Sequence, residues 1–163
     1  MRSYWQMLVE TQRRSEHFVS YRTFEEFKAD FWDSPHAQGV LKGLLVQTPL
    51  GQPIAGLLFR VFNGWIQELG VAYTDYSIEH KIYGQDLIKW HLIQWGQRNG
   101  CRIYDLMGVD VGANEKKKQG IYQFKAKWGG RLCQYGVYDK IYAPWRAGVM
   151  NMGTRLARRI RGN

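Results

Sequence analysis

The sequence predicts a single α/β (α+β) domain in which helices flank a mixed, mostly antiparallel sheet. First, the 163 residues are 45% hydrophobic and 23% charged, a profile typical of one globular domain with a continuous core. Second, the four prolines lie between periodic stretches and not inside them. Third, the hydrophobic period alternates between that of a helix and that of a strand, which gives the order ααβββαβαβα. We therefore expect one domain over residues 1–163.

Two helices are expected at the start of the chain. Residues 2–14 place Trp5 and Leu8 on one side, as in an amphipathic helix. A second helix is expected over residues 23–32, because Thr23 is followed three residues later by a glutamate. This spacing is typical of a capping box, which satisfies backbone N–H groups at the start of a helix.

The next three segments have the pattern of an antiparallel meander. Strands are predicted over residues 40–48, 53–62 and 65–72. A Pro-Leu-Gly-Gln turn at 49–52 joins the first two strands. Asn63-Gly64 joins the second and third, because Asn-Gly readily adopts the positive φ angles of a two-residue hairpin loop.

A long helix is expected after an irregular loop over residues 73–81. It begins at Gly84 and ends before Asn99-Gly100. Its apolar face is predicted from the residues spaced at helical intervals, which are Gly84, Leu87, Ile88, His91, Leu92 and Trp95. His91 is therefore expected to be buried and hydrogen-bonded, and not to be a catalytic base.

The last part of the chain alternates strand and helix. The segments expected there are a short strand over 102–107, a Gly-, Asp- and Lys-rich loop over 108–118, a helix over 119–128, a strand over 131–142 and a helix over about 144–161. Pro144 suits the first position of that last helix. An apolar stripe along the helix is surrounded by arginines, so the helix is basic and amphipathic.

The positive charge of the chain lies in its second half. The formal net charge is +9. Residues 1–80 hold 7 Lys and Arg against 9 Asp and Glu, whereas residues 81–163 hold 16 against 5. This excess favours an anionic partner such as nucleic acid, lipid headgroups or a phosphorylated substrate.

Several kinds of site are excluded by inspection. The sequence has no P-loop, no G-x-G-x-x-G motif after a strand and no G-x-S-x-G motif, and its histidines are too far apart for an H-x-x-x-H site, so no metal is expected. Two cysteines without C-x-x-C spacing favour a reducing compartment. There is no apolar leader and no run of about 18 apolar residues. We therefore expect a cytoplasmic protein whose membrane contact, if any, is peripheral.

Three motifs in the second half occur in a specific order. They are Tyr-Asp-Leu-Met-Gly at 104–108, Gly-Ile-Tyr-Gln-Phe-Lys-Ala-Lys-Trp-Gly-Gly at 120–130 and Tyr-Gly-Val-Tyr-Asp at 135–139. Together with Gly-Gln-Pro-Ile-Ala-Gly at 51–56 and the opening helix, they resemble the FemABX family of aminoacyl-tRNA-dependent peptidyltransferases. The resemblance covers nearly the whole chain. It implies the second of the two GNAT-like halves that are typical of that family.

The resemblance implies transfer of an aminoacyl group from aminoacyl-tRNA to an amine. The acceptor is expected to be a peptide or a UDP- or lipid-linked peptidoglycan precursor, which would place the protein in cell wall synthesis. Aminoacyl-tRNA is then a co-substrate, and no other cofactor is expected. Because an aminoacyl ester is already activated, the protein has to align the amine, keep it unprotonated and stabilise the developing oxyanion. This chemistry requires no covalent nucleophile.

The resemblance also assigns roles to individual residues. The pair Phe124-Lys125 matches the family's catalytic Phe-Lys pair, in which the lysine stabilises charge at the reacting ester. Arg14 matches an arginine that contacts the substrate's diphosphate, and Tyr73 and Tyr76 match aromatic residues of the substrate cleft. Asp105, at the end of a strand, is a further candidate for substrate binding. Each role has an alternative. Lys125 could be a solvated lysine on the helix surface, the two tyrosines could be structural, and Asp105 could form a turn.

Other charged residues are candidates for contact with tRNA or another anion. They are Lys116, Lys117 and Lys118 before the helix, and Arg155, Arg158 and Arg159 in the last helix. A solvated charge run is the alternative for the lysines. Three interpretations remain for the last helix, namely packing on the domain, lying on an anionic membrane and binding tRNA.

Two other functions remain open. One is an acetyl-CoA-dependent GNAT N-acetyltransferase, because residues 81–86 resemble the family's R/Q-x-x-G-x-G/A pyrophosphate loop, although Asp86 would repel pyrophosphate. The other is a non-catalytic subunit that binds RNA or a membrane through the basic second half. Only one GNAT-like half is recognised. We therefore expect that a homodimer or a partner subunit completes the cleft, that the protein takes a smaller acceptor, or that the chain is a fragment of a two-domain enzyme.

Overall fold

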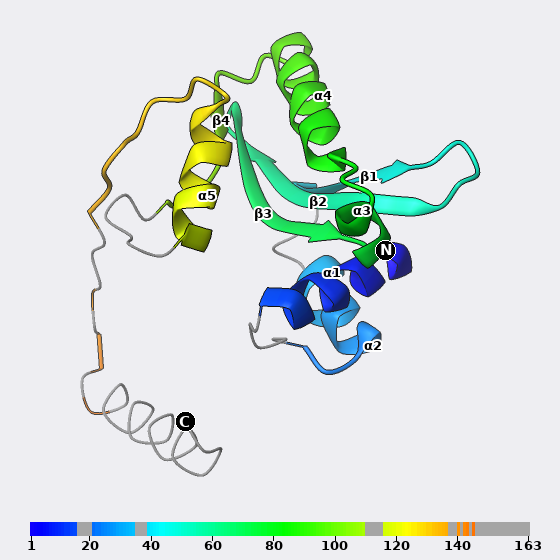
Figure 1. Cartoon of the computed structure of the whole chain (residues 1–163). Helices are drawn as coiled ribbons and strands as arrows, with labels where there is room; N and C mark the ends of the chain where they lie inside the picture. The colour runs from blue at the N-terminus through cyan, green and yellow to red at the C-terminus, as the bar shows by residue number, and fades with distance from the viewer. Residues whose placement is uncertain are drawn as a thin grey trace. The chain divides into compact units, whose positions relative to one another are not determined.

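The computed structural model describes residues 1–15, 21–34, 39–109, 116–136, 140, 142, 143 and 145. The chain divides into two compact units, Met1–Lys125 and Ala126–Asn163. The sheet and the helices that pack on it belong to the first unit (Figure 1). One domain over the whole chain stays a prediction.

The described strands form one mixed sheet in the order β1-β2-β3-β4. They are β1 (Leu41–Gln47), β2 (Pro53–Phe62), β3 (Trp65–Tyr73) and β4 (Ile103–Asp105). The first three strands form an antiparallel meander, and β4 pairs in parallel with the start of β3. A parallel neighbour requires a crossover, which α4 (Gly84–Arg98) supplies. The predicted mixed, mostly antiparallel sheet is confirmed.

The hairpin between β2 and β3 contains a bulge that decides which side chains share a face. Asn63 and Gly64 have φ angles of 47° and 74°, as the predicted two-residue turn requires. Further along, Phe59 is opposite Glu68 and Leu58 is opposite Gly70, so Leu69 is an extra residue. Side chains five positions apart on a regular strand point to opposite faces. The extra residue brings Glu68 and Tyr73 to the same face, where each contacts groups on the α4 side.

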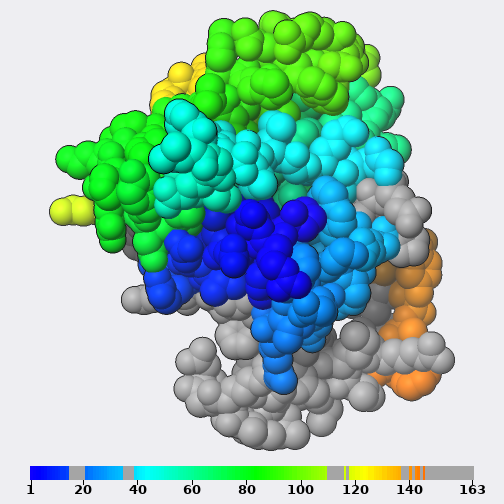
Figure 2. Space-filling model, turned by 90° about the vertical axis from the view of Figure 1, so that its right-hand side faces the viewer, coloured from blue at the N-terminus to red at the C-terminus, as the bar shows by residue number. Residues whose placement is uncertain are grey.

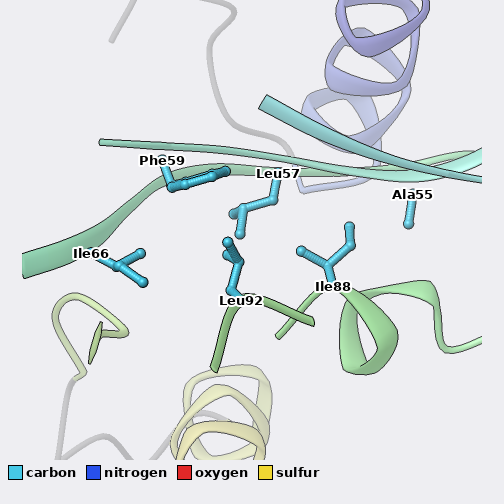
Figure 3. Packing of buried hydrophobic residues seen from close by; sticks show 6 residues of the cluster. All are labelled: Ala55, Leu57, Phe59, Ile66, Ile88 and Leu92. Atoms are coloured by element: carbon cyan, nitrogen blue, oxygen red, sulfur yellow. The ribbon is translucent and has the colours of Figure 1, made fainter. Parts of the chain in front are cut away.

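Helices cover both faces of the sheet. On one face, α1 (Arg2–Ser15) and α2 (Phe24–Phe27) form a core with the sheet, whose buried members are Tyr4, Met7, Phe27, Leu58 and Ala72. Figure 2 shows α1 (dark blue) beside the segment of α2 and the following π-helical turn η1 (Lys28–Trp32), in a lighter blue. On the other face, Ile88 and Leu92 of α4 point toward side chains of β2 and β3 (Figure 3).

The buried face of α4 differs from the predicted one. Its buried residues are Gly84, Gln85, Ile88, Lys89, Leu92 and Gly96. A Cβ atom on Gly84 would lie 2.6 Å from Cβ of Ala55, so this glycine allows the helix to approach β2 closely. The buried face is rotated relative to the predicted one, since Gln85 and Lys89 are buried whereas Leu87 is 58% exposed. His91 is also exposed, so the expectation of a buried histidine was wrong.

Several segments differ from their predicted boundaries. The predicted loop 73–81 contains the short helix α3 (Asp75–Glu79), because Thr74 Oγ1 caps it by accepting a hydrogen bond from Ser77 N at 3.1 Å. Helix α5 (Lys116–Ala126) begins three residues before the predicted position 119, since lysines and glutamine are good helix formers. Residues 131–136 of the expected strand 131–142 have no strand structure and no partner strand among the described residues. The last helix lies outside the described residues, apart from Trp145.

Candidate functional site

The predicted site residues fall into two groups along β3. The lysine group lies near β4 and comprises Glu68, Lys89, Tyr104, Asp105, Phe124 and Lys125. The arginine group lies at the end of β3 and comprises Glu10, Arg13, Arg14, Tyr73, Asp75 and Tyr76. Glu68 of the first group and Tyr73 of the second are separated along β3 by the bulge at Leu69. The bulge directs both side chains to the same face of the sheet.

Lys125 is held by the backbone that follows β4. Its Nζ donates a hydrogen bond to the carbonyl of Gly108 at 2.7 Å and lies 3.4 Å from the carbonyl of Met107. Met107 has a φ of 64°, the left-handed region, which turns the chain after β4. Lys125 is half-buried. It therefore does not correspond to a freely solvated lysine on a helix surface.

The environment lowers the pKa of Lys125. Burial is the largest cause, because it disfavours the charged form. The carboxylates of Glu68 and Asp105 act in the opposite direction and raise the pKa, whereas the ammonium of Lys89 lowers it. The pKa of Lys125 is thus set by opposing effects, because partial burial lowers it and two nearby carboxylates raise it.

Asp105 is engaged by its own turn and by the neighbouring strand. Its Oδ1 accepts a hydrogen bond from Met107 N at 2.7 Å, and its Oδ2 accepts one from Nε2 of Gln67 at 3.2 Å. The first contact is typical of a turn-forming aspartate. The predicted contact of Asp105 with substrate stays a prediction.

A buried polar network next to Lys125 was missed by sequence reasoning. Oε1 of Glu68 accepts hydrogen bonds from Nζ of Lys89 at 2.5 Å and from the hydroxyl of Tyr104 at 2.6 Å. Lys89 is 1% exposed and Glu68 is 7% exposed. Burial and the Glu68 carboxylate strongly raise the pKa of Tyr104, so its hydroxyl keeps its proton and donates. The only sequence signal was a lysine next to the apolar stripe of a helix, which normally indicates a solvated side chain.

Phe124 connects this network to Lys125. Nζ of Lys89 lies 5.3 Å from the centre of the Phe124 ring, within the range of a cation–π interaction. In the predicted catalytic pair, the Phe124 ring therefore lies against the buried Lys89 ammonium, and Lys125 binds the backbone that follows β4.

The arginine group consists of exposed or half-buried ion pairs. Arg13 and Arg14 both form ion pairs with the carboxylate of Asp75 at the start of α3. Arg14 also donates to the carbonyl of Tyr73 at 2.9 Å and to Oγ1 of Thr11 at 3.2 Å. The Arg13 side chain is 70% exposed, compared with 28% for Arg14. Arg14 is thus the better positioned of the two arginines.

The two tyrosines of this group have different environments. Burial is the largest cause that raises the pKa of Tyr73 to about 12, and the charges of Glu68 and Asp86 add to it. Tyr73 packs against the core on the α4 side. Tyr76 is 39% exposed and stacks on the ring of His80, with 4.1 Å between ring centres. Of the two, Tyr76 offers the more accessible ring.

The predicted anion contacts are only partly described. Lys116 and Lys118 are exposed in the first turn of α5, and the side chain of Lys117 lies outside the described part. Arg155, Arg158 and Arg159 lie outside the described residues as well. Their contact with tRNA or another anion stays a prediction.

The start of α4, where a coenzyme A loop would lie, is closely packed. Gly84 is in contact with Ala55 of β2, and Gln85 is buried with its Nε2 donating to the carbonyl of Gly56 at 2.7 Å. Asp86 places a carboxylate in the first turn of the helix. Among the residues that the structure describes, there is no cluster of His, Cys, Asp or Glu suited to a metal ion. Over the same residues, no helix has the length and apolar character needed to span a bilayer.

Comparison with solved structures identifies the fold. An aminoglycoside antibiotic 6'-N-acetyltransferase from Acinetobacter baumannii is 16% identical and superposes with a TM-score of 0.54, over 87% of this chain and 92% of that chain. Its counterpart from Acinetobacter haemolyticus is 15% identical with a TM-score of 0.51, over 87% and 94%. At such low identity the likeness shows the fold alone, which is that of GNAT acetyltransferases. No curated protein matches the chain.

Comparison with family models identifies the family. The model of the FemAB family matches residues 26–152. The match includes β1 to β4, the lysine group, Tyr73 and Tyr76, but begins after Arg14. It agrees with the resemblance carried by the three motifs of the second half. With its GNAT-like fold and a match over most of its length, this chain belongs to the FemAB family.

Proposed function

We propose that the protein transfers an aminoacyl group from aminoacyl-tRNA to an amine of a peptide or of a peptidoglycan precursor. The observation that carries this proposal is the position of Lys125. This residue of the Phe-Lys pair is half-buried, fixed on the carbonyl of Gly108 and close to the carboxylates of Glu68 and Asp105. A cation held in this way is suited to stabilise negative charge that develops on a substrate oxygen.

The proposed reaction needs no group beyond the two substrates and the protein. The lone pair of the amine attacks the ester carbon, a C–N bond forms and the carbonyl oxygen becomes an oxyanion. Lys125 stabilises this oxyanion with its ammonium. The oxyanion then collapses, the C–O bond to the terminal ribose breaks, and the released ribose oxygen takes the proton that the amine loses. The products are an amide and the uncharged tRNA.

The arginine group is the proposed contact for the acceptor. A diphosphate that links a precursor to uridine or to a lipid would replace the carboxylate of Asp75 on Arg14. A guanidinium binds phosphate oxygens through paired hydrogen bonds, and partly exposed ion pairs contribute only about 0–1 kcal/mol. Replacing the Asp75 carboxylate by a phosphate group on Arg14 therefore costs little free energy. Tyr76 offers an accessible aromatic ring beside this position.

The remaining contacts belong to the same proposal. Lys116 and Lys118 contact the phosphates of tRNA, and the basic last helix lies on tRNA or on the inner face of the membrane. A second copy of the chain or a partner subunit completes the acceptor cleft. The reaction takes place in the cytoplasm, where charged tRNA is available.

A product assay with matched variants tests the proposal. Purified protein is given a panel of charged tRNAs and amine acceptors, including UDP-linked and lipid-linked precursors, and new amides are detected by mass. Lys125→Ala should lower kcat by about 10²–10³-fold, the usual cost of losing one oxyanion contact. Lys127→Ala, two positions away and exposed, serves as the control and should retain activity. If Lys125→Ala retained the full activity expected of the control, the proposed role of Lys125 would be wrong.

The acetyl-CoA alternative is distinguished by a binding measurement. Its support is the GNAT-like fold, in which a helix start often binds phosphate through backbone N–H groups. Against it stand the carboxylate of Asp86 in the first turn and the inward orientation of Gln85. Calorimetry with acetyl-CoA should therefore detect no binding. Binding that strengthens in Asp86→Gly would favour the acetyltransferase instead.

A further inference from the structure

The buried pair of Lys89 and Glu68 calls for an explanation other than stability. Lys89 is almost completely buried among the apolar residues of α4, β2 and β3. Removing two charges from water costs several kcal/mol per ion, and apolar residues of similar volume are often as stable or more stable in such places. A buried ion pair is therefore weak evidence for a purely structural role.

The network has a rigid geometry because one oxygen receives both donors. Lys89 from α4 and Tyr104 from β4 both donate to Oε1 of Glu68 on β3, at 2.5 Å and 2.6 Å. Two donors from different elements fix the rotation of the carboxylate. Glu68 faces α4 because it alternates regularly with Ile66, which belongs to the core on that side, and the bulge at Leu69 comes after it. Three elements of the fold thus converge on one buried carboxylate.

Two contacts extend from this network to the catalytic pair. The Lys89 ammonium faces the ring of Phe124 at 5.3 Å, so the ring has a fixed cation beneath it. The carbonyls that hold Lys125 follow Tyr104 in the chain by three and four residues. Both members of the pair are therefore attached to elements that the network joins.

We propose that Lys89, held by Glu68 and Tyr104, is a positioning residue that fixes Phe124 and thereby the direction in which Lys125 presents its ammonium to the reacting ester. This inference rests on the proposed function of Lys125. Neither Lys89 nor Glu68 touches substrate in this account. Their effect is on geometry and on the charge around Lys125, so their loss lowers kcat more than it changes KM.

A double variant separates positioning from stability. Lys89→Met alone leaves a buried carboxylate without its partner and lowers the unfolding midpoint strongly. Lys89→Met combined with Glu68→Gln removes both charges and should restore most of the midpoint. Its kcat should remain on the order of tenfold to a hundredfold below that of the wild type, because small misplacements of a catalytic group have effects of that size. Recovery of both midpoint and kcat would overturn the inference and leave a structural role.

A second readout does not depend on activity. The pH dependence of Lys125 labelling by acetic anhydride, measured by peptide mass, reports its pKa. Among the described residues, the charged groups that shift the pKa of Lys125 are Glu68 on β3, Lys89 on α4 and Asp105 on β4. In the double variant, the carboxylate that raises the pKa of Lys125 and the ammonium that lowers it are both absent, so their opposite effects largely offset each other. If the network fixes Lys125, its loss exposes Lys125 and shifts the labelling curve to higher pH; an unchanged curve or one at lower pH would overturn the inference.

The two readouts distinguish the possible failures. If Lys125→Ala turns over as the wild type does, the proposed function has failed, whatever the labelling curve shows. If Lys125→Ala is inactive while the double variant is fully active, the proposed function stands and the positioning role of Lys89 has failed. If no acceptor in the panel reacts, the direction of the labelling shift decides the inference alone.

Discussion

The lysine group and the arginine group are built from opposite kinds of interaction. In the lysine group, Lys89 and Glu68 are buried and share their hydrogen bonds with Tyr104. In the arginine group, Arg13 and Arg14 pair with Asp75 at positions that water reaches. The first arrangement resists change and suits a group that must meet a reacting atom. The second is easily exchanged and suits a group that must take up and release an anionic substrate.

The largest effect is expected from breaking the buried pair. Lys89→Met leaves the Glu68 carboxylate buried without a cation, which costs about 3–5 kcal/mol of unfolding free energy. Urea unfolding followed by circular dichroism measures it. Lys42→Met on β1 exchanges an exposed lysine for the same residue and should stay within about 0.5 kcal/mol of the wild type. Equal effects would show that the pair at 68 and 89 is not buried as described.

A smaller effect on stability is expected at the start of α4, where this helix packs on β2. Gly84→Ala places a Cβ 2.6 Å from Cβ of Ala55, and overpacking of this kind costs about 1–3 kcal/mol. The control is Gly120→Ala in α5, where no described atom beyond its chain neighbours and its own helix backbone lies within 4 Å of the added Cβ. That substitution should stabilise the helix by about 0.5–1 kcal/mol. Unfolding midpoints of the two variants should therefore move in opposite directions.

The smallest effect on stability is expected in the arginine group. Asp75→Asn removes the carboxylate that pairs with Arg13 and Arg14, but solvent screens these pairs. The unfolding free energy should fall by about 0–1 kcal/mol. Affinity for a diphosphate-linked acceptor should rise, because the carboxylate closest to Arg14 is removed, whereas Glu10 lies 4.0 Å from it. A large loss of stability would show that the group is as rigid as the lysine group.

The sequence predicted the fold better than it predicted the site. The meander was found because Asn63-Gly64 and the alternating strands are local signals, and the long helix because Ile88 and Leu92 have helical spacing. The network was not found, since α4 buries a different face from the one that its spacing predicts, and Lys89 lies on that face. Glu68 faces the same side as Tyr73 only because of a bulge, which alternation does not reveal. Such tertiary effects leave little trace in local sequence.

The pair Phe124-Lys125 shows what a resemblance adds. Periodicity gave no reason to choose Lys125 over the other lysines of its helix, and the family motif singled it out. The structure adds its surroundings, which are the carbonyls after β4, the ring over Lys89 and two carboxylates. The motif thus indicated the position, and the contacts suggest why a cation is held there.

The pH dependence of a single turnover tests the role of Lys125 most directly. If its ammonium stabilises the oxyanion, the rate is present below the pKa of Lys125 and is lost as the pH rises through it. Because burial lowers that pKa, the loss should begin below the pH at which an ordinary lysine titrates. Lys125→Arg keeps its charge at any accessible pH, so its slower rate should show no such alkaline loss. The same alkaline loss in both proteins would contradict the account.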